Sequence, residues 1–395
     1  MVASYRDVLS VPGAYRLMST ALLARLPQAM APLAVLLLVR GATHSYAAAG
    51  FATGAYAFAN AGCAPVQGRL VDRLGRAWVL IPSALGMAAS LAGLTASASG
   101  GGSAGVVIVL SGLAGALAPP VAPAVRALFG EVFEDAGVRE RAYALDSVLQ
   151  EVAWATGPLV VALVITIASA AAAVMLLAVL YVLGTSLFVR SPLARGPGRA
   201  RIGDERRSAL ASADLRALLA PIALMGVGLG AVEVGLPALA LHAGSRPASG
   251  LFLTVWSVGS MAGGLWYGAR AWGGGLVHRY RALMLLAVAL TAPLIFARSV
   301  PAGIVGSLLA GLTIAPIFSC QYALVGRAAS AGTANESFTW VASALIGGVA
   351  LGSALGGATV APAGVSGPFL VACVASALAA SVAFRISDPV PQLAS

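Results

Sequence analysis

Charged residues are scarce in this chain of 395 residues, and lysine is absent altogether. Asp, Glu, Lys and Arg make up 10% of the sequence, whereas soluble domains carry roughly 25%. Hydrophobic residues account for 59%, and the mean hydropathy is +0.91. The few charges lie between apolar runs of about 20 residues, the length that crosses a bilayer. This pattern excludes a soluble globular protein and predicts an all-α integral membrane protein.

Cysteine and histidine are also rare, with three of each. None falls into a CxxC or HExxH spacing, so we expect no metal site and no cofactor. The stretch GVGLG at 226–230 lacks the lysine of a phosphate-binding loop, and no ATP-binding motif is found. The formal net charge of +10 would suit nucleic acid, but the arginines are spread over alternate loops. We therefore predict no nucleic-acid partner.

The apolar runs predict twelve transmembrane helices arranged as two six-helix bundles. The longest polar stretch divides the chain into an N-terminal bundle (1–190), a cytoplasmic linker (191–216) and a C-terminal bundle (217–395). Similar motifs recur about 200 residues apart, as expected for a duplicated six-helix unit. The predicted spans are 14–39, 47–66, 77–98, 104–128, 142–168, 171–189, 217–241, 249–271, 281–298, 301–325, 336–359 and 364–385.

Arginine is distributed unevenly between the two sides of the predicted bundles. Both termini and the even-numbered loops carry nearly all of it, whereas the opposite loops contain only Arg40, Arg246 and Arg298. Arginine-rich loops lie on the cytoplasmic side of cell membranes. We therefore predict a multi-pass protein of the cell membrane with both termini in the cytoplasm. The first span has no signal-peptide cleavage pattern and is expected to be retained.

The sequence GRLVDRLGR, residues 68–76, places four charges between two apolar runs. It resembles the G-x-L-x-D-R-x-G-R loop between the second and third helices of major facilitator superfamily transporters. The resemblance implies a cytoplasmic gate that locks the two six-helix halves together in the outward-facing state. The predicted gate residues are Gly68, Asp72, Arg73, Gly75, Arg76 and Glu131, with Glu131 and Glu134 as the acidic partners of the arginines.

These residue types suit a tight turn between helices. Glycine allows two helix ends to meet closely, and a carboxylate at Asp72 can face the N-terminus of a neighbouring helix. The corresponding loop of the second half, residues 264–281, keeps arginines but has lost the acidic residue. We therefore expect one strong latch and one weak latch.

The fifth predicted span contains ATGPLV, residues 155–160. Its Gly157-Pro158 pair resembles the fifth-helix motif of proton-coupled antiporters in the same superfamily, which favours export. The sequence departs from that motif at Ala153, where a glycine is usual. Pro158 is expected to kink the helix, and Gly157 to permit close packing.

Three charges fall deep inside predicted spans, where each costs roughly 2.5–3.5 kcal/mol unless it faces a partner or a cavity. Arg25 and Glu151 lie at similar depth, so we predict that they pair, with Gln28 and Gln150 as polar neighbours. Protonation of Glu151, or an anionic substrate at Arg25, would break this pair. A static ion pair that fixes helix packing is the alternative.

Glu233 is the third charge, and it lies nearer the extracellular side without an obvious arginine partner. It is a second candidate for carrying a proton, unless it only extends into the outer vestibule. Asp146, one turn inside the fifth span, is expected at the membrane interface.

Small residues and prolines indicate how the spans pack. Gly348, Gly352 and Gly356 recur every four residues and predict close helix packing, with a sliding face between the halves. The prolines at 119, 120 and 123 are expected to bend the fourth span.

The sequence favours a monomeric, proton-coupled secondary transporter that exports small amphipathic compounds. One alternative is a proton-coupled uptake symporter for a small metabolite, and another is a non-transporting membrane scaffold or sensor. A membrane enzyme is disfavoured because no convincing set of catalytic side chains lies at one membrane face. The expected partners are a small-molecule substrate, protons and the lipid bilayer.

Overall fold

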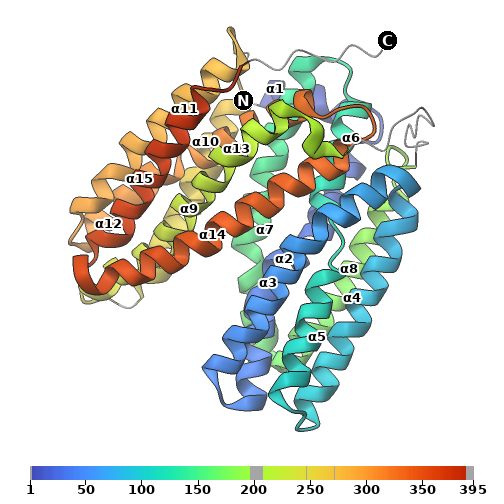
Figure 1. The fold of residues 1–395 in the computed structure, drawn as a ribbon, viewed down its shortest axis with the longest axis vertical. Coiled ribbons are helices and arrows are strands. Elements are labelled where there is room, and N and C mark those ends of the chain that lie inside the picture. Colours follow the sequence, from blue (N-terminus) through green and yellow to red (C-terminus); the bar gives the residue numbers. More distant parts are fainter. Residues whose placement is uncertain (1, 196–207, 246, 271, 388–395) are drawn as a thin grey trace.

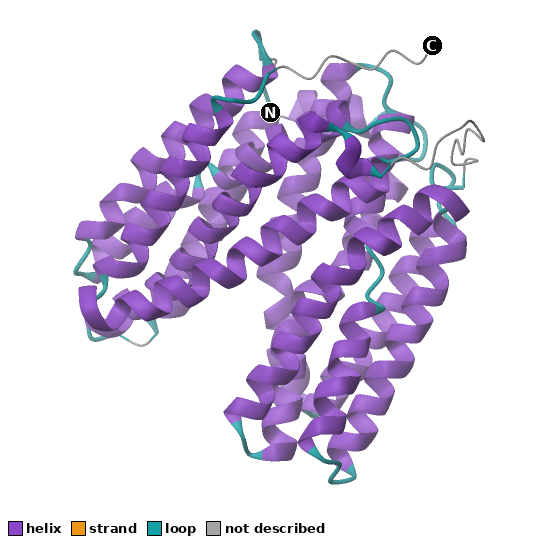
Figure 2. Ribbon diagram, in the orientation of Figure 1, coloured by secondary structure: helices purple, strands orange, loops and turns teal. Residues whose placement is uncertain are grey.

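The structure is a computed structural model that describes residues 2–195, 208–245, 247–270 and 272–387. Every regular element in these ranges is a helix (Figure 2). Residues 196–207 of the predicted linker, and Arg246, lie outside the described residues. We refer to α1–α8 as the N-terminal half and to α9–α15 as the C-terminal half.

The N-terminal half begins with a short helix that hydropathy did not predict, followed by helices that match the first six predicted spans. The fourth span is divided between two helices. The elements are α1 (Val2–Leu9), α2 (Ala14–Thr43), α3 (Tyr46–Leu74), α4 (Arg76–Ser99), α5 (Ala104–Ala116), α6 (Val121–Val132), α7 (Ala136–Ile167) and α8 (Ala170–Val189).

The C-terminal half repeats this plan, and its fourth span is again divided. A short 3-10 helix continues α11. The elements are α9 (Ala213–His242), α10 (Ala248–Gly268), α11 (Leu276–Thr291), η2 (Ala292–Phe296), α12 (Val300–Gly311), α13 (Ile314–Ala328), α14 (Ala334–Ala363) and α15 (Ser366–Ala383), with η1 (Ala209–Ala211) before α9.

Eleven segments of the described chain are long and apolar enough to cross a membrane, counting α5 with α6, α11 with η2, and α12 with α13 as single segments. The segment α3 is not among them, although it has 29 residues. The glycines and tyrosines of α3, together with Asn60, lower its mean hydropathy. The structure is therefore that of an all-helical, multi-pass membrane protein.

Proline explains both divided spans. Pro119 and Pro120 separate α5 from α6, because proline has no N–H to donate to the preceding turn. The expected bend is thus a complete break. Pro316 lies at the start of α13 and prevents the helix from continuing through Leu312 and Thr313. In contrast, α7 is helical throughout and passes Pro158 without a break.

The two halves lie side by side, close together at the end that carries α1 and α6 and apart at the opposite end (Figure 1). Three clusters of buried hydrophobic residues follow this arrangement. The largest draws on both halves, from Val8 to Ile386. The second comes only from α2–α8, and the third comes from α9 onward. The halves therefore share a core at one end and have separate cores at the other.

A seam of glycines joins α9 to α14 within the C-terminal half. A methyl group on Gly352 would lie 2.7 Å from the Cα of Val227, and one on Gly348 would lie 3.0 Å from the Cα of Gly226. The predicted close packing is confirmed. The predicted sliding face is wrong, because these glycines face α9 and not the other half.

The contact of α14 with α3 uses different residues. The Ser343 hydroxyl donates a hydrogen bond of 2.6 Å to the carbonyl of Ala61, and Thr339 packs against Gly68. Polar side chains, together with one glycine on α3, therefore form the contact between the halves along these two helices.

We expect Gly352→Ala to lower the free energy of unfolding by about 1–3 kcal/mol, because the new methyl group would collide with the α9 backbone. The matched control is Gly347→Ala on the same helix, where a Cβ meets open space. There, helix propensity alone favours alanine. Thermal unfolding of the two purified variants in detergent measures the difference. Equal melting temperatures would contradict close packing between α9 and α14 at Gly352.

Candidate functional site

The Asp72 carboxylate, at the end of α3, binds the first turn of α14 in the other half. It accepts hydrogen bonds from the backbone N–H groups of Asn335 (3.1 Å) and Glu336 (2.8 Å), and from the Asn335 side chain (2.7 Å). Thr333, the N-cap residue of α14, makes no side-chain cap of its own. Asp72 therefore caps a helix from the opposite half, where the helix dipole favours a negative charge.

Neighbouring residues bring the two halves together at this point. A Cβ on Gly68 would lie 2.8 Å from the carbonyl oxygen of Asn335, so only glycine permits the approach. Gly75 has a φ of 90°, a left-handed conformation that glycine adopts without strain, in the turn between α3 and α4. Arg69 lies 3.6 Å from Glu336 across the halves.

Of the predicted ion pairs between gate arginines and acidic residues, one forms and one does not. Arg76 contacts Glu131, but both residues belong to the N-terminal half, so this ion pair does not join the halves. Arg73 and Glu134 are exposed and form no ion pair with the described residues. The connection between the halves at this point therefore depends on Asp72 and Arg69.

A second polar cluster joins the halves between α7 and α11. Arg279 forms an ion pair with Glu140, with Nη2 3.0 Å from Oε2. The Tyr267 hydroxyl donates to the same carboxylate at 2.8 Å. The acidic residue missing from the repeated loop is therefore supplied by the other half, so the second latch also contains an ion pair.

The short helix α1 also contacts both halves. Asp7 pairs with Arg141 of α7 at 3.1 Å, while the Tyr5 hydroxyl donates to the carbonyl of Gly264 on α10 at 3.1 Å. Burial raises the pKa of Tyr5 to about 12, so the phenol remains a neutral donor. The N-terminal helix is thus a third connection at this end of the molecule.

A buried charge cluster occupies the N-terminal half beside its contact with α13. Asp146, fully buried, pairs with Arg25 at 2.5 Å and with Arg126 at 2.9 Å. Arg126 also binds Gln150 and lies 3.8 Å from the centre of the Tyr322 ring. Because Tyr322 belongs to the C-terminal half, the arginine–aromatic contact extends the cluster across the interface.

The predicted pairing of Arg25 with Glu151 is wrong, because Arg25 pairs with Asp146. A similar depth in the membrane is not enough to make two residues pair. Asp146 and Glu151 are five residues apart, which rotates the direction of the side chain by about 140° beyond one full helical turn. Asp146 and Glu151 therefore lie on different faces of α7, and Arg25 meets the first. Arg126 also lies within a predicted span, and a charge at that position indicates from the sequence that an acidic residue is buried beside it.

Glu151 instead faces the C-terminal half. Its side chain is partly exposed, and Ser260 of α10 and Glu233 of α9, both in the other half, lie within electrostatic range of it. Glu233 is exposed, and so is Gln28, which has no hydrogen bond to the described residues. Glu151 and Glu233 thus come from opposite halves, and neither pairs with Arg25, which is bound to Asp146.

Gly157 approaches α2, as predicted for a close-packing position. A Cβ there would lie 2.7 Å from the Cβ of Ala29 and 3.1 Å from the backbone nitrogen of Met30. With Pro158 beside it, this part of α7 is held against the helix that carries Arg25.

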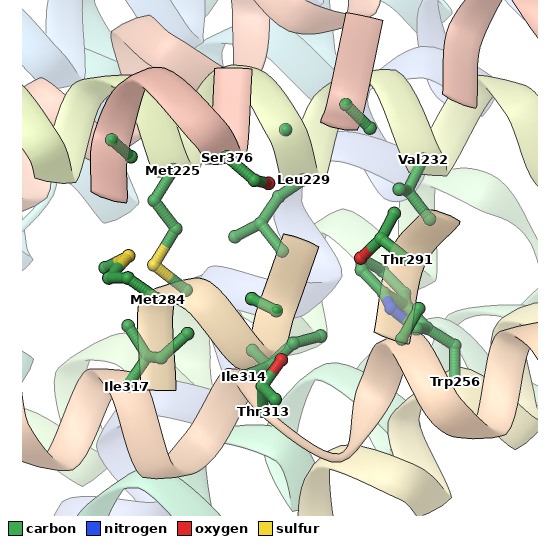
Figure 3. A pocket seen from close by; sticks show the side chains of 15 residues that line it. Met225, Leu229, Val232, Trp256, Met284, Thr291, Thr313, Ile314, Ile317 and Ser376 are labelled. Atoms are coloured by element: carbon green, nitrogen blue, oxygen red, sulfur yellow. The ribbon is translucent and has the colours of Figure 1, made fainter. Parts of the chain in front are cut away.

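A small cavity of about 40 Å³ lies inside the C-terminal half, beside the break between α12 and α13 (Figure 3). Met225, Leu229, Trp256 and Ile314 are among its apolar walls, and none of its lining residues is charged. The volume accommodates a few water molecules at most, so we do not regard it as a site for a transported molecule.

Comparison with known families identifies the chain. The model of the Major Facilitator Superfamily matches residues 17–335, which is most of the sequence. The chain therefore belongs to the Major Facilitator Superfamily, a family of transporters and not of enzymes. Among curated proteins, no match was found.

Solved structures share the fold at low sequence identity. A human organic anion transporter is 20% identical, with 94% of this chain and 99% of that one covered and a TM-score of 0.74. An outward-facing bacterial homologue of the iron transporter ferroportin is 13% identical, with 94% and 98% covered and a TM-score of 0.79. The fucose:proton symporter of Escherichia coli is 15% identical, with 95% and 98% covered and a TM-score of 0.69.

We expect Asp72→Ala to increase opening at this end by about tenfold, because it removes charge-assisted hydrogen bonds between the halves. The measurement is the alkylation rate of a cysteine placed at Thr339, which is fully buried, with the three natural cysteines replaced by serine. Glu131→Gln is the matched control, because it breaks an ion pair within one half. Similar rates in the two variants would contradict the assignment.

Asp146→Asn is expected to lower the free energy of unfolding by about 3–5 kcal/mol, since it leaves two buried guanidinium groups without a carboxylate. Adding Arg25→Met should restore part of the loss. Melting temperatures in detergent test both steps, with the exposed Glu134→Gln as the control. A melting temperature unchanged by Asp146→Asn would show that the cluster contributes no stability.

Proposed function

We propose that this protein is a secondary active transporter of the cell membrane that works by alternating access. The observation that carries the proposal is the unequal contact between the halves. Three connections join them at one end, through Asp72, Glu140 and Tyr5, whereas the cores at the other end are separate. This asymmetry is what one state of an alternating-access cycle requires.

In this proposal, twelve helices cross the membrane as two six-helix bundles, 1–190 and 217–395, with the linker 191–216 between them. The helix α3 is the twelfth span, since 29 residues extend over about 43 Å. The arginine distribution supports cytoplasmic termini. The joined end, which carries α1, is then cytoplasmic, and the structure corresponds to an outward-facing state.

We further propose that protons supply the energy and that Glu151 and Glu233 carry them. These carboxylates come from opposite halves and lie within electrostatic range of one another. Asp146 is already held by two arginines, whereas Glu151 and Glu233 have no ion pair with the described residues. A carboxylate without a cationic partner inside a membrane is suited to binding and releasing a proton.

Export of small amphipathic compounds is the proposed direction, supported by the resemblance at Gly157 and Pro158. Two exposed or partly exposed carboxylates would also suit a substrate with a positive charge, which would compete with the protons. The same architecture serves uptake when substrate and proton move together, so the direction of proton flow distinguishes the two functions. We propose that the transporter acts as a monomer.

The test is proton movement in proteoliposomes with an imposed pH gradient, using a panel of small amphipathic cations, anions and neutral metabolites. We expect at least one compound to dissipate the gradient with the wild-type protein, and Glu151→Gln to reduce the rate by at least about tenfold. Glu134→Gln, an exposed carboxylate in the turn before α7, should behave as wild type.

Each variant must first show the melting temperature of the wild type, so that a loss of transport is not a loss of folding. Proton influx coupled to substrate efflux supports export, and proton influx with substrate uptake supports the symporter. Equal rates for Glu151→Gln and wild type would refute the role of Glu151. No response to any compound would count against proton coupling itself.

A further inference from the structure

A large groove opens at the end of the molecule where the halves meet. Its volume is about 930 Å³, and it lies beside the Asp72 contact. The walls come from the ends of α3 and α8, the start of α4, one face of α6, and the loop between α13 and α14. Both halves therefore contribute to it, and the groove is separate from Glu151 and Glu233.

The walls of this groove carry an excess of positive charge. Four arginines line it, at positions 73, 76, 190 and 195, against the acidic residues Asp72 and Glu131. Both acidic groups are already engaged, Asp72 with α14 and Glu131 with Arg76. Arg73, Arg190 and Arg195 are exposed and form no ion pair with the described residues.

A buried arginine and the N-terminus of a helix also favour binding of an anion in the groove. Arg76 is only 7% exposed, lines the groove, and has an Nε that donates no hydrogen bond to the described residues. It is also the first residue of α4, a helix of 24 residues whose N-cap, Gly75, supplies no side-chain cap. The N–H groups of such a helix end attract anions, and phosphate above all.

The chain itself does not offer a suitable negative segment for the groove. Residues 196–207, which follow Arg195 in the sequence, contain four arginines and only two acidic residues. An anion that is not part of the chain therefore matches the positive charge of the groove better than residues 196–207 do. Trp78, which lines the same groove, is 79% exposed and would pack against an apolar group carried by that anion.

We infer that this groove is a binding site for a phosphate-bearing anion, distinct from the transport pathway. The phosphate would lie at the N-terminus of α4 and interact with Arg76, Arg190 and Arg195. The α13–α14 loop of the other half forms the opposite wall of the groove.

Two sources could supply this chemistry, a soluble phosphate compound and the headgroup of an anionic phospholipid. The test uses full-length protein in nanodiscs of neutral phosphatidylcholine, to which pyrophosphate is added. A second set of nanodiscs contains one part in five phosphatidylglycerol and no pyrophosphate. The readouts are pyrophosphate affinity by titration calorimetry and the shift in melting temperature in both sets.

The diagnostic variant is Arg190→Gln with Arg195→Gln, two groove residues that lie outside the gate contacts. We expect it to bind pyrophosphate at least about tenfold more weakly than wild type and to lose the melting shift. The control is Arg16→Gln with Arg385→Gln, which removes the same charge from exposed arginines that do not line the groove. It should retain wild-type affinity.

The results distinguish a soluble phosphate compound from a phospholipid headgroup. Pyrophosphate binding that depends on Arg190 and Arg195 supports a soluble phosphate ligand. A shift that requires phosphatidylglycerol, and is lost only in the groove variant, supports a lipid headgroup. Absence of binding and of any shift in wild type would overturn the proposal, and so would equal losses in the two double variants, which would indicate general charge attraction.

Discussion

The contact on which this arrangement depends is a carboxylate bound to the N-terminus of a helix in the opposite half. Asp72 caps α14 through backbone N–H groups, so the interaction requires a particular position and direction of the helix and not only an opposite charge. A small movement of α14 along its own axis would break it completely. Gly68 is necessary for the same reason, because a larger residue would keep the two helices apart. The contact therefore depends on the position of both helices as well as on charge.

Much of the fold follows from local properties of the sequence. Apolar length predicts where the helices lie, and the prolines before α6 explain where one of them breaks. The close packing at Gly348, Gly352 and Gly157 follows from their lack of a side chain. The sequence also indicated that Asp72 could face the N-terminus of a neighbouring helix, because a carboxylate interacts favourably with the helix dipole.

The partners of the charged residues could not be predicted in the same way. Depth in the membrane can be estimated from a residue's position along its helix, but the face on which it lies depends on how that helix is rotated in the bundle. Arg25 therefore meets Asp146 instead of Glu151. Glu140 and Arg279 lie 139 residues apart and come from opposite halves, so no local pattern connects them. The docking of α1 is invisible to hydropathy because the helix is short.

In the proposed alternating-access cycle, the separation of the hydrophobic cores limits the free-energy cost of moving the halves. Each half retains its own cluster of buried side chains at the end where the halves diverge, so neither has to repack its interior when they move relative to one another. Only the shared cluster and a few polar contacts must be exchanged for a new interface on the other side. A cycle built in this way can be nearly balanced in free energy, and a gradient worth a few kcal/mol is then sufficient to drive it in one direction.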